Sequence, residues 1–175
     1  DDVKSAIPFM KKSHAKKKPF FINLWIHEPH TPFHVDPKLQ KLFPDLPEAD
    51  NIYAATLYHA DLRIGQLLDA LDEMKISDNT LVIFSSDNGP ARGSPNSPIA
   101  LSYDSATGPG YGIGAAKGIT GGRRAFKGAL MEGGIGVPFI ARWPGKIAAG
   151  KVDKTSVFSA VDLLPTFCEV GNVKL

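Results

Sequence analysis

The chain has 175 residues, of which 43% are hydrophobic and 22% charged, and its formal net charge is +2. These values are typical of one globular domain and exclude a disordered or fibrous chain. The small charge gives no reason to expect a nucleic-acid partner, and no apolar run approaches the roughly 18 residues of a membrane-spanning helix, so no membrane contact is expected.

The first two predicted elements are a helix and a strand. Val3, Ile7 and Met10 recur at helical spacing and are followed by the basic connector KKSHAKKK, which predicts a short helix within residues 1–18. The next segment, PFFINLWI at 19–26, is continuously apolar and rich in aromatic residues. It predicts a strand buried on both faces.

A long helix is predicted after the proline-rich residues 34–48, for which no regular structure is expected. Asp50 can cap this helix. Its apolar stripe consists of Tyr53, Leu57, Ile64, Leu67, Leu68, Leu71 and Met74. Its polar side carries His59, Arg63, Gln66, Asp69 and Glu73. This pattern is typical of a surface helix with one face on the core.

Two further buried strands are predicted, LVIFSS at 81–86 and VPFIARW at 137–143, and residues 159–170 predict a closing helix. Residues 91–124 are rich in Gly, Pro and Ser and too long for a simple connector, so we expect a loop that faces the substrate. Buried strands separated by helices and long loops predict an α/β fold in one domain.

Asp87 and Asn88 follow the second buried strand directly, and Gly89 and Pro90 then turn the chain out of the sheet. Ligands in α/β proteins collect beyond the carboxyl ends of strands. A carboxylate and an amide oxygen are suitable ligands for Ca²⁺ or Mg²⁺. The alternative is a plain turn in which these side chains bond their own backbone.

His27, His30 and His34 follow the first predicted strand in WIHEPHTPFH. Prolines forbid the helix that a His-Glu-x-x-His zinc site needs, and Thr31 occupies the position of its second histidine. A histidine here is better suited to donate a hydrogen bond to an anionic oxygen or a leaving group. An ordinary surface histidine is the alternative.

Lys127 precedes the Glu-Gly-Gly triplet that leads into the third strand, which tethers its ammonium near the same edge of the sheet. By itself it could be an ordinary solvated charge. A cation site, a hydrogen-bond donor and a point charge together suit an ester of a tetrahedral oxyanion, because the charge on its oxygens must be neutralised while one ester oxygen leaves.

The segments FFINLWIHEPHTPF, NTLVIFSSDNGP and FKGALMEGGIGVPFIARWPG, in this order around a long helix, resemble the second half of the catalytic domain of type I sulfatases. The resemblance is to the arylsulfatase and N-acetylgalactosamine-6-sulfatase kind. It implies an alkaline-phosphatase-like α/β fold, a mixed sheet with flanking helices, and hydrolysis of a sulfate monoester, with a sulfated carbohydrate or other small molecule as substrate.

The resemblance also implies the roles of four residues. Asp87 and Asn88 match metal ligands for Ca²⁺ or Mg²⁺, while His30 and Lys127 match catalytic residues that contact and bind the sulfate. The nucleophile of the family is a formylglycine made from Cys or Ser. Such proteins are mostly secreted, periplasmic or lysosomal, which suggests a secreted or periplasmic location.

Three departures from the family pattern indicate that part of the catalytic site is missing from this sequence. No Cys or Ser precedes x-Pro-x-Arg, the upstream Asp pair of the metal site is absent, and Gly136 stands where an Arg is common. Residues 1–175 are therefore expected to be a partial sulfatase catalytic domain, inactive alone. Sheet edges left uncovered by a missing part would make this fragment prone to self-association.

Three other functions remain open at this stage. A phosphoester hydrolase of the same superfold could use the same metal, His and Lys. A polyanion-binding module could use KKSHAKKK with Arg123 and Arg124, although no aromatic residues interleave with the lysines. A nucleotide-binding domain could use the glycines of residues 108–122, but their spacing fits neither phosphate-loop pattern.

Overall fold

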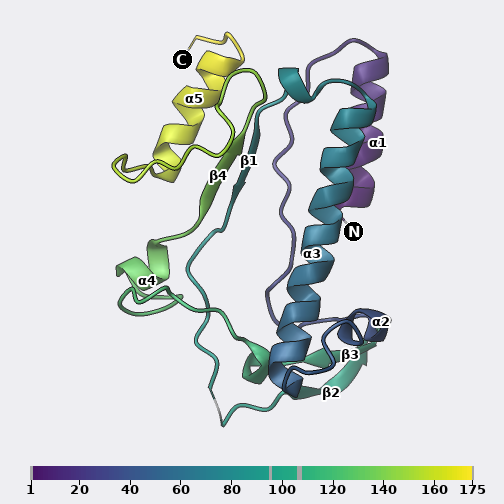
Figure 1. Cartoon of the computed structure of the whole chain (residues 1–175), viewed down its shortest axis with the longest axis vertical. Helices are drawn as coiled ribbons and strands as arrows, with labels where there is room; N and C mark the ends of the chain where they lie inside the picture. Colours follow the sequence, from purple (N-terminus) through teal and green to yellow (C-terminus); the bar gives the residue numbers. More distant parts are fainter. Residues whose placement is uncertain (1, 95, 106–107, 175) are drawn as a thin grey trace.

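The computed structural model describes residues 2–94, 96–105 and 108–174. The α-helices are α1 Asp2–Ala15, α2 Pro37–Gln40, α3 Glu48–Glu73, α4 Glu132–Ile135 and α5 Leu163–Val170. The strands are β1 Val82–Ser85, β2 Ala100–Ser105, β3 Gly108–Tyr111 and β4 Phe139–Arg142. Short 3₁₀ turns occupy Ser77–Asn79, Ile113–Ala115 and Ala160–Asp162. In Figure 1, α3 runs along the long axis, with α1 beside its upper part and α2 and the β2–β3 hairpin at its lower end.

Helix α3 confirms the predicted long helix, but Pro47 rather than Asp50 is its N-cap residue. Asp50 lies in the first turn, where its carboxylate favours the positive end of the helix dipole. The side-chain amide of Asn51 donates to the carbonyls of Gln40 at 2.8 Å and Phe43 at 2.7 Å, which ties the preceding segment to the helix.

The expectation of no regular structure between residues 34 and 48 is wrong for one short stretch. Pro37 begins α2, and the Asp36 side chain caps it by accepting from the Lys38 backbone N–H at 2.8 Å. Proline is well suited to the first turn of a helix, where its missing N–H would have no partner within the helix.

Two separate apolar clusters lie at the two ends of α3. The lower cluster contains Phe33, Val35, Ile52, Ala55 and Ala115. The upper cluster contains Met10, Ala70 and Leu71, with the half-buried Phe20, Ile22 and Val82 packed against it. One long helix therefore connects both ends of the described structure.

The prediction of a buried strand at residues 19–26 is wrong. The segment is extended but carries no strand pairing in the described part of the chain, and its side chains alternate between half-buried and exposed. Phe20 and Ile22 pack on the upper cluster, whereas Phe21 and Trp25 are 67% and 79% exposed. Figure 1 shows the segment running between α3 and β1, and a ladder requires a hydrogen-bonded neighbour that the described residues do not provide.

Strands β1 and β4 confirm the positions of the two other predicted strands and pair antiparallel, with Ser85 opposite Phe139 and Val82 opposite Arg142. The prediction that both are buried is wrong for the described residues, because Phe84 is 40% and Ile140 59% exposed. Helix α5, preceded by a 3₁₀ turn, confirms the predicted closing helix. The expected loop at 91–124 instead contains the antiparallel hairpin of β2 and β3, and Phe33 bridges to Tyr111 beside it. Among the described residues, no helix combines the length and apolarity needed to cross a membrane.

Replacing Ile52 by Ala tests the lower cluster, because this side chain is 0% exposed. We expect the free energy of unfolding to fall by about 2–5 kcal/mol, since the change leaves a cavity. Leu57→Ala on the same helix, where the side chain is 43% exposed, is the control and should cost less than about 1 kcal/mol. Urea unfolding of both variants measures the difference, and equal losses would contradict this assignment of the core.

Candidate functional site

The two segments that flank the β1–β4 pair come together at its lower end. Because β4 is antiparallel to β1, the start of β4 lies beside the end of β1. The Ser85 hydroxyl donates to the Pro138 carbonyl at 2.9 Å. Asp87 and Asn88 therefore lie at the same end as the Glu-Gly-Gly segment that precedes β4.

Glycines bring these two segments into backbone contact. The Gly89 N–H donates to the Gly134 carbonyl at 2.7 Å. A Cβ at Gly89 would overlap the carbonyl oxygen of Gly133, and a Cβ at Gly133 would overlap that of Ala125. A larger residue at Gly89 would force the two segments apart, and a larger residue at Gly133 would disturb the loop of residues 124–134, so both positions require glycine.

Lys127 lies beside the turn that follows β1. Its backbone N–H donates to the Pro90 carbonyl at 2.9 Å, and the Gly133 N–H donates to the Arg124 carbonyl at 2.8 Å. These bonds fold the loop of residues 124–134 against the residues that follow Asn88. The Lys127 side chain is exposed and can reach a ligand in solvent.

Asp87 and Asn88 offer oxygen atoms at this turn. Asp87 is exposed, while the Asn88 side-chain amide nitrogen donates to the Gly89 carbonyl at 2.8 Å. Because the amide nitrogen bonds within the turn, the amide oxygen of Asn88 can face a ligand. A carboxylate and an amide oxygen are the ligand types that a hard cation prefers. Ca²⁺ requires about six to eight oxygens, more than these two residues supply. The described residues contain no group of three or more His, Cys, Asp or Glu arranged to hold a metal.

His30 lies in the exposed loop after the extended segment. Its Nδ1 is 2.6 Å from the Thr31 carbonyl oxygen, which can only accept, so Nδ1 carries the proton. The Nε2 atom is then the ring nitrogen available to a ligand. The His27 ring packs edge-on against the His30 ring, with 5.6 Å between the two ring centroids. No hydrogen bond or ion pair joins His30 to Asp87 or Lys127 within the described residues.

Helix α3 holds the loop of His30 at two points. Before His30, the Glu28 carboxylate is 2.9 Å from His59 Nδ1. After it, the buried ring of Phe33 packs edge-on against Tyr53 at 6.0 Å between centroids. Tyr53 and His59 are about 9 Å apart along the helix axis, so His30 lies between two anchors less than two turns apart.

Gly118 lies between the same helix and the turn after β1. A Cβ at Gly118 would lie 2.5 Å from Cβ of Pro90 and 3.1 Å from the hydroxyl of Tyr53, so only glycine fits there. Burial raises the pKa of the Tyr53 phenol, which keeps it neutral. Tyr53 therefore packs against Phe33 after the His30 loop and lies next to Gly118, which in turn lies against Pro90.

Arg123 fills the place beside Gly136. A Cβ at Gly136 would lie 3.2 Å from Cδ and 3.3 Å from Nε of the Arg123 side chain. The Arg123 side chain therefore packs against the backbone at Gly136, in space that a larger residue at 136 would need.

The sequence analysis missed the bond between Glu28 and His59, although the residues of α3 that take part gave a signal. His59, Arg63 and Gln66 are spaced by four and three residues, which places them on one face of a helix. The partner Glu28 could not be assigned, because it is 31 residues away in sequence.

Comparison with known proteins identifies the family to which this chain is related. The family model described as Sulfatase matches residues 3–173. The chain is 29% identical over 170 residues to arylsulfatase G of Mus musculus, covering 97% of this chain and 29% of that protein. It is 32% identical over 178 residues to N-acetylgalactosamine-6-sulfatase of Mus musculus, covering 98% of this chain and 28% of that protein.

Solved structures show the same fold. Ps i-CgsB in complex with k-i-k-neocarrahexaose superposes with a TM-score of 0.78 at 32% identity, covering 99% of this chain and 34% of that chain. The PsFucS1 sulfatase from Pseudoalteromonas sp. superposes with a TM-score of 0.70 at 27% identity, covering 98% of this chain and 29% of that chain. The predicted alkaline-phosphatase-like α/β fold is confirmed, and the chain spans about a third or less of these proteins.

Replacing Gly89 by Ala tests the backbone contact. The added methyl group would meet the Gly133 carbonyl, so we expect a loss of at least about 1–3 kcal/mol in the free energy of unfolding. Gly65→Ala on α3 is the control, because nothing lies within 4 Å of the added Cβ, and it should stabilise by about 0.5–1 kcal/mol. Thermal unfolding distinguishes the two variants, and an unchanged midpoint for Gly89→Ala would argue against the contact.

Proposed function

Because the chain belongs to the sulfatase family, we propose that it forms the second half of a catalytic domain that hydrolyses a sulfate monoester of a carbohydrate. The chain covers 29% of arylsulfatase G, so the activity is proposed for the whole protein and not for these residues alone. The observation that supports the proposal is the bond from the Lys127 N–H to the Pro90 carbonyl, because it joins the Lys127 backbone to the residues that directly follow Asp87 and Asn88.

Lys127 and His30 are the proposed catalytic and substrate-binding residues. The Lys127 ammonium would lie against the sulfate oxygens and compensate the charge that they carry in the transition state. His30 would present Nε2 to the same group, because its Nδ1 proton is committed to the Thr31 carbonyl. An imidazolium at this position can donate to a sulfate oxygen or give its proton to the departing ester oxygen.

Asp87 and Asn88 are the proposed ligands of a Ca²⁺ or Mg²⁺ ion. Their oxygens match the chemistry of a hard cation, and the remaining ligands would come from outside the described residues. In the family the cation neutralises sulfate charge, and a formylglycine supplies the nucleophilic oxygen. The 175 residues contain no Cys or Ser before x-Pro-x-Arg, so this group would come from another part of the protein.

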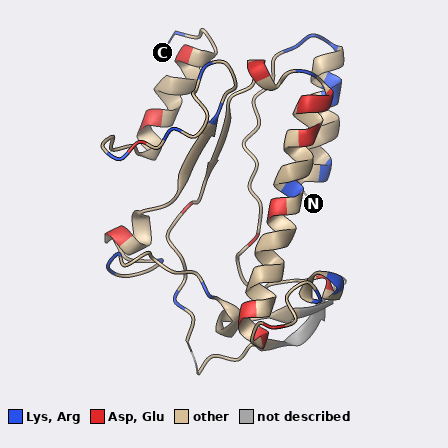
Figure 2. Cartoon of the chain, viewed as in Figure 1, with Lys and Arg blue, Asp and Glu red and all other residues tan. Residues whose placement is uncertain are grey.

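A sulfated carbohydrate is the substrate class that we favour. One structural neighbour was solved in complex with k-i-k-neocarrahexaose, and one relative is an N-acetylgalactosamine-6-sulfatase. Arg92, Arg123 and Arg124 belong to the loops that lead to the site, and Figure 2 shows basic positions along these loops. Sulfate groups elsewhere on a glycan would be attracted by these charges.

The other candidate functions lose support. A lysine and a histidine would serve a phosphate ester equally well, but both curated relatives described above are sulfatases. The basic segment KKSHAKKK forms the end of α1 and the residues after it, at the upper end of α3 and far from the Lys127 loop in Figure 2. The family match therefore favours the enzyme over a polyanion-binding module.

Location and self-association are part of the same proposal. We place the whole protein in a secreted or periplasmic setting on the basis of its family. The isolated chain would self-associate, because Phe21, Trp25 and Leu130 are 67%, 79% and 94% exposed. Burying these side chains against a second copy would remove their apolar surface from water.

The metal assignment is tested by Asp87→Ala in the whole protein. We expect bound Ca²⁺ or Mg²⁺ to fall from about one ion per molecule to near zero, because a charged oxygen ligand is lost. Asp69→Ala, which removes an exposed carboxylate on α3, should keep the metal. Elemental analysis of dialysed protein gives the ratio, and stoichiometric metal in Asp87→Ala would remove Asp87 from the site.

The enzymatic role is tested by Lys127→Ala in the whole protein with a sulfated oligosaccharide as substrate. We expect kcat to fall by about 10²–10³-fold, the usual cost of removing one group that stabilises transition-state charge. Lys151→Ala removes an exposed lysine and should leave kcat unchanged. The isolated 175-residue chain should release no sulfate. Ion chromatography of released sulfate measures both, and full activity of Lys127→Ala would reject this role.

A further inference from the structure

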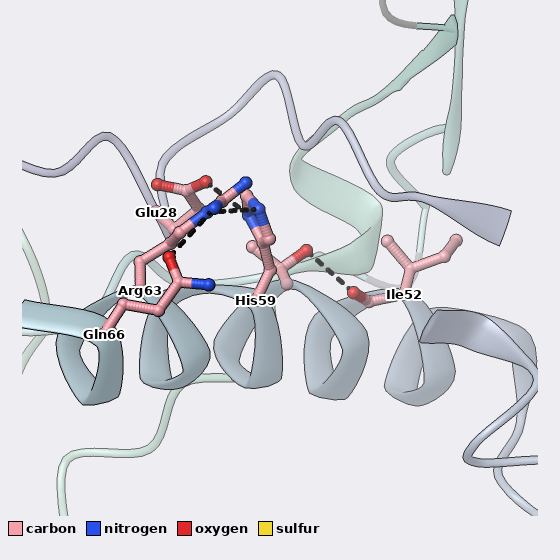
Figure 3. Close-up of polar contacts among 6 residues, drawn as sticks. Glu28, Ile52, His59, Arg63 and Gln66 are labelled. Atoms are coloured by element: carbon pink, nitrogen blue, oxygen red, sulfur yellow. Dashed lines mark hydrogen bonds and ion pairs between the residues drawn. The ribbon is translucent and has the colours of Figure 1, made fainter. Parts of the chain in front are cut away.

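A polar cluster of Glu28, His59, Arg63 and Gln66 joins the His30 loop to α3, as Figure 3 shows. The Glu28 carboxylate lies 2.9 Å from His59 Nδ1, and the two side chains are only 26% and 33% exposed. Glu28 and His59 are 31 residues apart in sequence, so their hydrogen bond fixes the His30 loop on α3.

The hydrogen bonds of the cluster define the orientation of the His59 ring. Arg63 Nε donates to His59 Nε2 at 3.3 Å, and a guanidinium can only donate. His59 Nε2 is therefore the acceptor, and Nδ1 carries the proton that it donates to Glu28. Gln66 in turn accepts from Arg63 Nη1 at 3.0 Å, which holds the guanidinium in place.

We propose that Glu28 and His59 are positioning residues that hold His30 for the reaction, an inference that rests on the proposed function. Glu28 is separated from His30 only by Pro29, whose ring restricts the backbone between them. The His30 N–H donates to the His27 carbonyl at 2.8 Å, so the turn that carries His30 encloses Glu28. Holding Glu28 against α3 thereby restricts where the His30 ring can lie.

The loop is also held by Phe33, but that contact does not replace the bond between Glu28 and His59. Phe33 is buried in the lower cluster and fixes the chain three residues after His30. A loop held only at Phe33 could still swing about that point, whereas a loop held at both ends cannot. A displacement of about 1 Å at a catalytic group can cost about 10²-fold in rate, so the added anchor matters for kcat.

A double-mutant cycle in the whole enzyme separates this role from simple stabilisation. The four proteins are wild type, Glu28→Ala, His30→Ala and the double variant, with kcat measured on a sulfate ester. We expect Glu28→Ala to lower kcat by about 10–100-fold in the wild-type background. In the His30→Ala background the same change should lower kcat by less than about 2-fold, because its effect acts through the missing ring.

Conservative variants provide the matched controls. Glu28→Gln keeps an oxygen that can accept from His59 Nδ1 and should retain most of the activity. Glu73→Gln breaks an exposed ion pair of 3.4 Å with Lys11 at the far end of the same helix and should leave kcat unchanged. If Glu28→Ala does not fold, His59→Leu takes its place in the cycle, because it removes the same bond.

The outcomes separate this inference from the proposed function. Equal losses from Glu28→Ala in both backgrounds would mean a purely structural role and would overturn the inference alone. Wild-type activity in His30→Ala would overturn the proposed role of His30 and this inference with it. A loss in Glu28→Ala that Glu28→Gln does not rescue would also overturn it, because the hydrogen bond would not be the cause.

Discussion

The close backbone contact at Gly89, Gly133 and Gly134 is the constraint on which the rest of the site depends. Two chain segments more than forty residues apart approach so closely that a Cβ at Gly89 would overlap the carbonyl oxygen of Gly133. The bond from the Gly89 N–H to the Gly134 carbonyl then fixes their register. As a result the Asp87–Asn88 turn and the Lys127 loop share one end of the β1–β4 pair, which is the arrangement that the proposed function requires.

Helix α3 extends this arrangement to the third segment. Its Tyr53 packs against Phe33 and lies next to Gly118, and its His59 bonds Glu28, so the loop that carries His30 is held at two points on one rigid element. Groups on a helix are held more accurately than groups on free loops, because the helix backbone is internally hydrogen-bonded. The polar face of α3 therefore has a role at the site that its exposed position alone would not suggest.

Two features of the described residues involve contacts that these residues do not provide among themselves. The segment at 19–26 is extended and apolar without ladder partners, and Phe21 and Trp25 are largely exposed. Asp87 and Asn88 offer two oxygens where a hard cation needs several more. Both agree with a chain that spans about 29% of arylsulfatase G, since a sheet and a metal site each draw on residues from distant parts of a sequence.

The sequence by itself determined the long helix and the positions of strands β1 and β4, and it supplied the residues proposed for the site, because helical periodicity, apolar runs and strand-end turns are local patterns. It also identified the family through three ordered motifs. It failed for residues 19–26, since pairing depends on a neighbouring strand and not on the segment's own composition. The sequence did not identify a hydrogen-bond partner for His59, and it did not predict that Gly89 would pack against Gly133 and Gly134. Those contacts join residues that are distant in sequence, so only the tertiary structure could bring Glu28 onto α3 and Lys127 beside Pro90.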